Sequence, residues 1–224
     1  MDWRALTLSL QLAVATLLVL LPVGVWAGRK LAWSQFRGKA LVEALLALPL
    51  VLPPTVLGFY LLVAMGGASP LGQWYASFSG RQLTFSFDGL LVASVIFNLP
   101  FAIQPMQRAF EAIAPEVREA ALCCGMSQMR MLRRIELPLA WPGILSALVL
   151  TFAHTLGEFG VVLMVGGSIP GETRTIALAI YDRVQAFDMA GASLMSTLLL
   201  LISLGAIGAS YAATNRLGRA RRHG

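Results

Sequence analysis

Few side chains in this 224-residue sequence could carry out covalent chemistry. The two lysines, Lys30 and Lys39, stand outside any G-x-x-x-x-G-K-[ST] motif, so the sequence offers no phosphate-binding loop for ATP. A membrane hydrolase would have to rely on His154 and Glu158, and no nucleophile elbow or Ser/His/Asp set accompanies them. The two cysteines are adjacent, with no histidine cluster nearby to complete a metal site. We therefore expect no catalytic residue, no metal and no cofactor in this chain.

The composition points to a membrane. Hydrophobic residues make up 57% of the chain, charged residues make up 12%, and the mean hydropathy is +0.73. A soluble domain carries about 25% charged residues. A chain of this size has too much surface to hide so many apolar side chains from water, so lipid must cover much of it.

Long uncharged runs predict the membrane spans, because a helix needs about 20 apolar residues to cross the bilayer. The first run is too long for a signal peptide and is followed at once by Arg29 and Lys30, so we expect it to remain. The fourth helix is expected to continue past Glu158 to about Val165. Residues 69–88 read as an interfacial loop or a short re-entrant piece. The sequence thus predicts a single domain, 1–224, with spans at about 6–28, 41–65, 89–108, 142–165 and 193–214.

The basic residues predict the orientation of these spans. Of the 17 basic residues, four fall on one side of the expected membrane: Arg4, Arg81, Arg174 and Arg183. Positive residues stay cytoplasmic, so we expect the N-terminus outside and the C-terminus inside, and the net charge of +6 reflects topology, not nucleic-acid binding. The thirteen on the expected cytoplasmic side are Arg29, Lys30, Arg37, Lys39, Arg108, Arg118, Arg130, Arg133, Arg134, Arg216, Arg219, Arg221 and Arg222.

One expected cytoplasmic loop, residues 108–141, is longer than a connector needs to be. Pro115 stands where a helix can begin, with acidic residues in the first turn and arginines near the end, as the helix dipole favours. Gly125 interrupts that helix and frees the backbone to turn or to approach another chain closely. Several methionines follow, and methionine suits a surface that adapts to a partner. A docking element and a helix resting on the lipid headgroups both fit this pattern.

The same loop contains a specific motif. Glu-Ala-Ala at 119–121 is followed after three residues by Gly125, and after nine more by Ile-Glu-Leu-Pro at 135–138. This spacing resembles the EAA loop of bacterial ABC importer permeases. The resemblance implies an all-α membrane protein of the type I importer fold, whose loop helix fits a groove on a cytoplasmic ATPase and transmits nucleotide-driven closure. The coupling residues here would be Glu119, Ala120, Ala121, Gly125, Leu137 and Pro138.

Other segments extend the resemblance over most of the chain. Leu-Pro-Pro-Thr-Val-Leu-Gly at 52–58, Leu-Gly-Glu-Phe-Gly at 156–160 and Ile-Pro-Gly-Glu-Thr-Arg-Thr at 169–175 are similar to the same regions of oxyanion permeases. With the short five-span length they resemble molybdate permeases in particular. Sulfate-type subunits tend to be longer and often carry an arginine near His154. The resemblance therefore implies molybdate import, with tungstate or sulfate as alternatives.

Polar residues on the apolar spans are candidates for an oxyanion path or gate. Hydroxyl and amide donors can pass an oxyanion without holding it, which translocation requires. Hydrogen bonding between helices explains such residues at least as well. We expect Pro53 and Pro54 to break the second helix, and Gly58, Gly157 and Gly160 to permit close helix packing. The path candidates are Thr55, Ser94, Asn98, Thr151 and His154, with Glu158 beside the gate.

Apart from Glu43 near the start of the second span, Glu158 is the one acidic residue within a predicted span. A dianion about 4 Å from a carboxylate would be repelled by roughly 8 kcal/mol at an effective dielectric constant near 20, so a bare glutamate facing the path would be a barrier. His154 lies one helical turn away and could pair with it, and backbone donors near Gly157 and Gly160 could also satisfy it. We therefore predict a structural role in which Glu158 is protonated or hydrogen-bonded.

The outer hairpin, residues 167–188, shows helical spacing of apolar residues and predicts a short amphipathic helix. It would close the pore, touch a substrate-binding protein or simply rest on the other spans. The residues with this spacing are Ile176, Ala177, Ile180, Val184 and Phe187.

The resemblance implies a complete transporter around this chain. Its partners would be a second copy of itself, two cytoplasmic ATPase subunits that bind ATP and Mg²⁺, a periplasmic or extracellular oxyanion-binding protein, and the lipid of the cytoplasmic membrane. A secondary transporter is the rival class, but the sequence has no convincing internal repeat and such a protein would leave the 108–141 loop unexplained.

Overall fold

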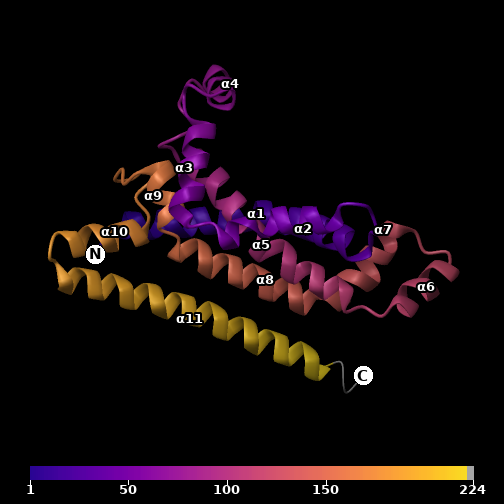
Figure 1. The fold of residues 1–224 in the computed structure, drawn as a ribbon. Coiled ribbons are helices and arrows are strands. Elements are labelled where there is room, and N and C mark those ends of the chain that lie inside the picture. The colour runs from indigo at the N-terminus through magenta and orange to yellow at the C-terminus, as the bar shows by residue number, and fades with distance from the viewer. Residues whose placement is uncertain (221–224) are drawn as a thin grey trace.

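The computed structural model describes residues 1–220, with side chains described as far as Ala212 apart from Ser210. Arg221 and Arg222, which we assigned to the cytoplasmic side, lie outside the described residues. No strand occurs in the described part of the chain (Figure 1). The helices are α1 Trp3–Trp33, α2 Lys39–Val51, α3 Pro54–Met65, α4 Pro70–Ser79, α5 Phe87–Glu111, α6 Pro115–Cys123, α7 Gln128–Met131, the π-helix η1 Leu132–Glu136, α8 Leu137–Gly157, α9 Gly160–Gly166, α10 Ile176–Gln185 and α11 Met189–Ala220.

Side-chain caps define where several of these helices begin. The Asp2 carboxylate accepts a hydrogen bond from the Ala5 N–H at 3.0 Å and starts α1. Ser69 and Ser86 cap α4 and α5 in the same way, each accepting from the N–H three residues on. Short polar residues at this position satisfy one of the backbone donors that have no partner inside the helix.

Four helical stretches are long and apolar enough to cross a membrane: α1, α5, the run from Gln128 to Gly157, and α11. A fifth candidate is the pair α2 and α3, which is bent by 109°. The bend lies at Leu52, where the backbone is extended before Pro53 and Pro54. Proline removes a backbone donor and disfavours helical geometry in the residue before it, so the second expected span, 41–65, is a broken helix.

The fourth span differs from the expectation of one continuous helix to Val165. Helix α8 ends at Gly157, the backbone is extended at Glu158, and α9 starts again at Gly160. The prediction of an unbroken helix was wrong because local hydropathy does not register the break. The Glu158 carboxylate instead turns onto the backbone of the next helix.

Helices α1, α5 and α8 form the centre of the molecule. Phe110 and Ile144 are fully buried where α5 meets α8. Helix α1 lies close against α5: a Cβ added to Gly28 would come within 2.9 Å of the Gln107 backbone nitrogen. Further along the same pair, the Thr16 hydroxyl donates to the Ser94 hydroxyl at 2.9 Å. Small residues allow such close backbone approach between membrane helices.

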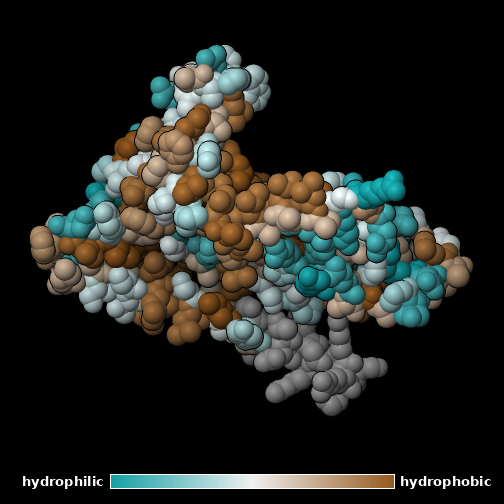
Figure 2. Space-filling view, in the orientation of Figure 1, coloured by the Kyte–Doolittle hydropathy of each residue, from teal (hydrophilic) through white to brown (hydrophobic). Residues whose placement is uncertain are grey.

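The two ends of the helical bundle differ in character. Helices α6 and α7 lie at one end with the far end of α1, while α10 and the N-terminus lie at the other (Figure 1). Figure 2 shows a broad apolar surface over the middle and a concentration of hydrophilic residues at the α6 and α7 end. Residues 69–88 contain α4, whose Trp74 and Phe78 side chains are exposed.

The outer hairpin contains α10, on which Ile176 and Ala179 are buried against Leu6 and Met195. Phe187, which we placed on this helix, lies beyond its end at a positive φ of 59° and is 87% exposed. The apolar spacing therefore overstates the helix by two residues at its C-terminal end.

Candidate functional site

The expected coupling motif lies on α6 and the turn after it. Pro115 starts the helix and Glu116 stands in its first turn. Glu119 and Ala120 are exposed, whereas Ala121 is buried. Of the three motif residues on this helix, one is therefore buried against the rest of the chain and the other two face outward.

Gly125 ends this helix in the left-handed region, with φ of 71°. Its N–H donates to the Leu122 carbonyl at 2.9 Å, and the Met126 N–H donates to the Ala121 carbonyl at 3.1 Å. Glycine is favoured at this position because a side chain would be strained there. A Cβ at Gly125 would meet no atom of this chain within 4 Å, so the space beside it is open.

The last motif residues, Leu137 and Pro138, form the first turn of α8. Proline is well suited to this position because its missing N–H is not needed in the first turn. The Glu136 side chain directly before them is completely buried and accepts hydrogen bonds from Arg29 and Arg118. The motif thus ends in a charged junction between the spans and α6.

The path candidates Asn98 and His154 meet between α5 and α8. His154 Nδ1 lies 3.0 Å from Asn98 Oδ1, and the Asn98 amide donates to the Ser94 carbonyl at 2.8 Å. The His154 ring also packs on Phe101, with ring centroids 3.9 Å apart. Since Asn98 is completely buried, these side chains form a polar contact between helices inside one chain.

Thr151 lies one turn from His154 on α8 and is 1% exposed. Its hydroxyl has no hydrogen-bond partner among the residues the structure describes. Thr55 is separate from this group: it is exposed in the first turn of α3, beside the break in the second span. The structure therefore brings together Asn98, Thr151 and His154 and leaves Thr55 elsewhere.

Glu158 does not pair with His154, as we had suggested it could. Its Oε1 accepts a hydrogen bond from the Val161 N–H at 2.8 Å, and the residue is 7% exposed. The carboxylate caps the start of α9 and satisfies a backbone donor that the break leaves without an intrahelical partner. This was the second of the two partners considered for Glu158, the backbone donors near Gly160.

The two helix breaks lie side by side, because α3 packs against α9. A Cβ added to Gly160 would lie 2.7 Å from Pro54 Cβ, and one added to Gly58 would lie 2.8 Å from Met164 Cβ. These two glycines therefore permit close packing. Gly157 does not, since a Cβ there would meet nothing within 4 Å.

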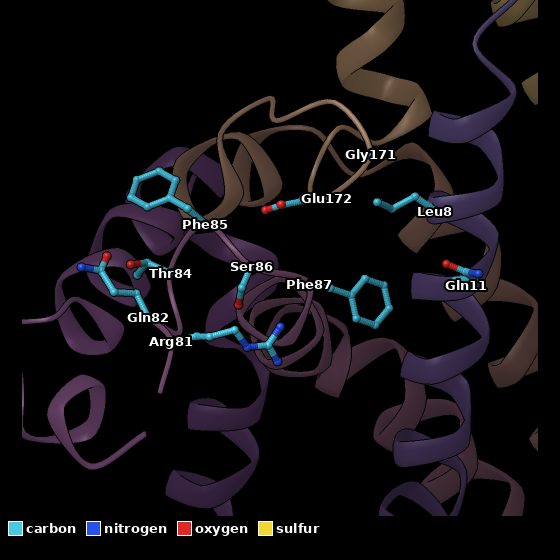
Figure 3. A pocket seen from close by; sticks show the side chains of 10 residues that line it. All are labelled: Leu8, Gln11, Arg81, Gln82, Thr84, Phe85, Ser86, Phe87, Gly171 and Glu172. Carbon is cyan, nitrogen blue, oxygen red and sulfur yellow. The ribbon is translucent and has the colours of Figure 1, made fainter. Parts of the chain in front are cut away.

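A hollow of about 560 Å³ lies at the end of the bundle that holds the N-terminus (Figure 3). Gln11 from α1, Arg81 from the loop before α5, and Glu172 from the loop after α9 line it. Arg81 also reaches Asp88 Oδ2 at 3.3 Å. The hollow contains charges of both signs and none of the path candidates.

Comparison with known proteins defines the family. Residues 20–219 match the family described as "Binding-protein-dependent transport system inner membrane component". The chain belongs to this family. This description names a component of the inner membrane, which agrees with the apolar helices of the structure.

Two individual relatives of this inner membrane component show which transport systems its sequence resembles. The "Molybdenum transport system permease protein ModB" of Azotobacter vinelandii is 46% identical over 210 residues, which are 94% of this chain and 93% of that protein. The "Sulfate transport system permease protein CysT" of Salmonella typhimurium is 32% identical over 196 residues, 86% of this chain and 70% of that protein.

The fold of this inner membrane component matches a solved structure. A bacterial ABC transporter involved in the import of the acidic polysaccharide alginate contains a chain that superposes with a TM-score of 0.77 at 17% identity, over 95% of this chain and 78% of that one. At this identity the likeness shows the fold, that of a type I ABC importer permease, and nothing about the substrate.

Three functional candidates escaped the sequence reasoning: Arg29, Arg118 and Glu136. The two arginines served there as topology signals, and Glu136 as a position within the motif. The available signal was an acidic residue directly before an apolar span, where an ionised group needs a partner. Nothing local identified which of the many arginines would supply it.

Proposed function

We propose that this chain is the membrane-spanning subunit of an ATP-driven importer that carries molybdate across the cytoplasmic membrane. The observation that carries the proposal is the 46% identity to a molybdenum transport permease over nearly the whole of both chains. The sulfate permease shares 32% and extends beyond the match, which makes sulfate the weaker candidate. Tungstate, whose oxyanion resembles molybdate in charge and shape, is the closer alternative.

ATP would be hydrolysed by a separate subunit that binds ATP and Mg²⁺. The absence of a phosphate-binding loop from the sequence supports this division of labour. Helix α6 would dock in a groove of that ATPase. The exposure of Glu119 and Ala120 and the open space beside Gly125 support docking through this face.

A second copy of the chain would complete the pathway. Helix α4 projects away from the other helices (Figure 1), and both α3 and α4 expose large apolar side chains. Phe59, Tyr60 and Val63 on α3 are each more than half exposed. Such a surface is suited to burial against a partner subunit as well as lipid. Two ATPases, one on each α6, would then drive a homodimer.

Among the path candidates, Thr55 is the one whose position best supports contact with a passing ion. It is exposed where the second span breaks, and irregular backbone in a membrane is tolerated where it lines a cavity or is buried in protein. His154 is half-buried, and Asn98 and Thr151 are buried, which favours helix–helix contacts as their main task. Glu158 would support α9 and leave the ion untouched.

A binding protein would deliver the ion at the end of the molecule that holds the N-terminus and the hollow lined by Gln11, Arg81 and Glu172. This places the N-terminus outside and α6 in the cytoplasm. ATP binding would close the ATPases and turn the cavity outward, and hydrolysis would reset it.

The test is uptake into proteoliposomes that contain the permease, its ATPase with ATP inside, and the binding protein outside. We expect molybdate uptake that requires ATP, competition by tungstate, and weaker competition by sulfate. Sulfate uptake that outcompetes molybdate would overturn the substrate assignment. Uptake that persists without ATP and follows an ion gradient would instead identify a secondary transporter.

A further inference from the structure

A single buried carboxylate joins three elements at the α6 end of the molecule. Glu136, the last residue of η1, is completely buried. Its Oε2 accepts a hydrogen bond from Arg29 Nε on α1, and its Oε1 accepts one from Arg118 Nε on α6 at 2.8 Å. Arg29 also donates to Gln128 Oε1 on α7 at 2.9 Å. Arg29 and Glu136 are thus in direct contact although they lie 107 positions apart in the sequence.

This ion cluster is the main attachment of α6 to the spans. Helix α6 buries one residue, Ala121, so apolar packing contributes little to holding it. Arg118 reaches back from α6 to Glu136, and its guanidinium lies 4.1 Å from the centroid of the Trp33 ring at the end of α1. Both contacts of Arg118 thus connect α6 to α1, one through the carboxylate and one through the ring.

The charges in the cluster are not interchangeable with neutral groups. Two guanidiniums face one carboxylate, so removing the negative charge leaves two positive groups with nothing between them. The arginines are 24% and 20% exposed, whereas the Glu136 side chain is fully enclosed.

The cluster also stands at a mechanically sensitive position. Glu136 ends a π-helix, a wide helical turn often found at functional sites, and α8 begins at the next residue. Helix α8 carries His154 and leads to Glu158 at its other end. Arg118 therefore contacts both the residue before α8 and the end of α1, so a displacement of α6 would act on both together.

We propose that Glu136 is a positioning residue that transmits the movement of α6 to the spans, with Arg118 and Arg29 as its two arms. This inference rests on the proposed function, in which α6 is the element that the ATPase moves. It assigns the coupling step to a defined ion cluster outside the exposed face of α6.

The experiment compares Glu136→Gln and Arg118→Lys with the wild type in the complete reconstituted complex. Glutamine keeps the shape of the side chain without its charge, and lysine keeps the positive charge without the planar fork that reaches Glu136 and covers Trp33. We expect both variants to copurify with the ATPase. ATP hydrolysis stimulated by the binding protein should fall by at least about tenfold, within the range of typical coupling energies, while basal hydrolysis stays near the wild-type rate.

A matched control is Glu111→Gln, which neutralises a glutamate at the same end of the molecule. Glu111 pairs with Arg108 and accepts from Gln107, both on its own helix, and Lys39 on α2 acts on it only from beyond ion-pair distance, so this change breaks no ion pair between two elements. We expect normal stimulation from it. Equal loss in the control would show a general charge effect and overturn the proposal.

The outcomes separate the two levels of inference. A wild-type complex that the binding protein does not stimulate would count against the proposed function. A stimulated wild type with equally stimulated Glu136→Gln and Arg118→Lys variants would overturn the role of the cluster. If Glu136→Gln does not assemble, Arg118→Lys, in which Arg29 still pairs with Glu136, decides the question. Stimulated hydrolysis does not depend on which oxyanion is carried.

Discussion

In this structure the Glu158 carboxylate is hydrogen-bonded to the backbone of its own chain. Its Oε1 accepts from the Val161 N–H, so a glutamine, which retains an acceptor oxygen, can make the same bond. We expect Glu158→Gln to assemble normally and to keep most uptake and the same preference among oxyanions. Glu158→Ala should lose the cap and lower stability by about 1 kcal/mol, seen as a reduced yield and unfolding midpoint of the purified complex.

The control for this prediction is the comparison between the two variants in one preparation. If Glu158→Gln abolishes uptake while the complex assembles like the wild type, the charge itself acts in transport. The structural role assigned to Glu158 would then be wrong.

Gly125 has two possible reasons to be glycine, and two substitutions separate them. Its φ of 71° disfavours valine, whereas asparagine tolerates this region. Docking against an ATPase would exclude any side chain there. We expect both Gly125→Val and Gly125→Asn to insert into the membrane and both to lose stimulated ATP hydrolysis. Normal stimulation of Gly125→Asn, measured beside the wild type, would reduce the role of Gly125 to shaping the turn.

At the level of residues, the sequence could predict what depends on near neighbours. Gly125 lies in the turn that its position after a short helix predicts, and Glu158 finds a backbone donor three residues away. The Arg29–Glu136–Arg118 cluster was beyond such reasoning, because it depends on which helices pack together. Many arginines lie at one end of the molecule, and their spacing in the sequence does not select a partner.

The packing of α3 on α9 is the element-scale feature most open to test. Gly160→Ala would bring a Cβ within 2.7 Å of Pro54 Cβ, and forced overpacking costs about 1–3 kcal/mol. We expect a lower unfolding midpoint for the purified permease in detergent. Gly157→Ala is the matched control, since its Cβ would meet no atom within 4 Å, and it should leave the midpoint unchanged. A destabilised control with an unaffected Gly160→Ala would contradict the packing.

Some helix boundaries could be predicted from the sequence and others could not, depending on whether a local or a long-range interaction sets them. The break before Pro53 was predictable, since proline acts through its own covalent geometry. The break at Glu158 was not predictable, because the apolar run continues on both sides of it. The Glu158 carboxylate can accept from the Val161 N–H only in the folded arrangement, in which α9 has left the axis of α8. The α6 helix followed from Pro115 and Gly125, which act locally at each end.

The whole molecule has a predicted direction across the membrane. Nine of the basic residues assigned to the cytoplasmic side lie on α1, α2, the loop between them, the end of α5 or the segments between α5 and α8, which share one end of the structure (Figure 1). We expect Gln73→Cys on α4 to react with an impermeant maleimide added to intact cells, and Gln35→Cys after α1 to react only once the cells are opened. Both side chains are exposed, so accessibility differs by side alone.

The background for this labelling needs Cys123→Ser and Cys124→Ser, because both native cysteines are exposed. Labelling of Gln35→Cys in intact cells, with Gln73→Cys protected, would reverse the orientation. The substitutions are otherwise matched, each replacing one exposed glutamine.

The close contact between α1 and α5 bears on how the chain is made. The ribosome adds 78 residues between the end of α1 at Trp33 and the end of α5 at Glu111. At about 5–20 residues per second, this takes roughly 4–16 seconds. During that time the surface of α1 around Thr16 and Gly28 has no partner from α5. We therefore expect α1 to stay beside the insertion machinery until α5 emerges, detectable as a crosslink from a photoreactive residue at Thr16 that disappears only once synthesis has passed Glu111 far enough for α5 to leave the ribosome.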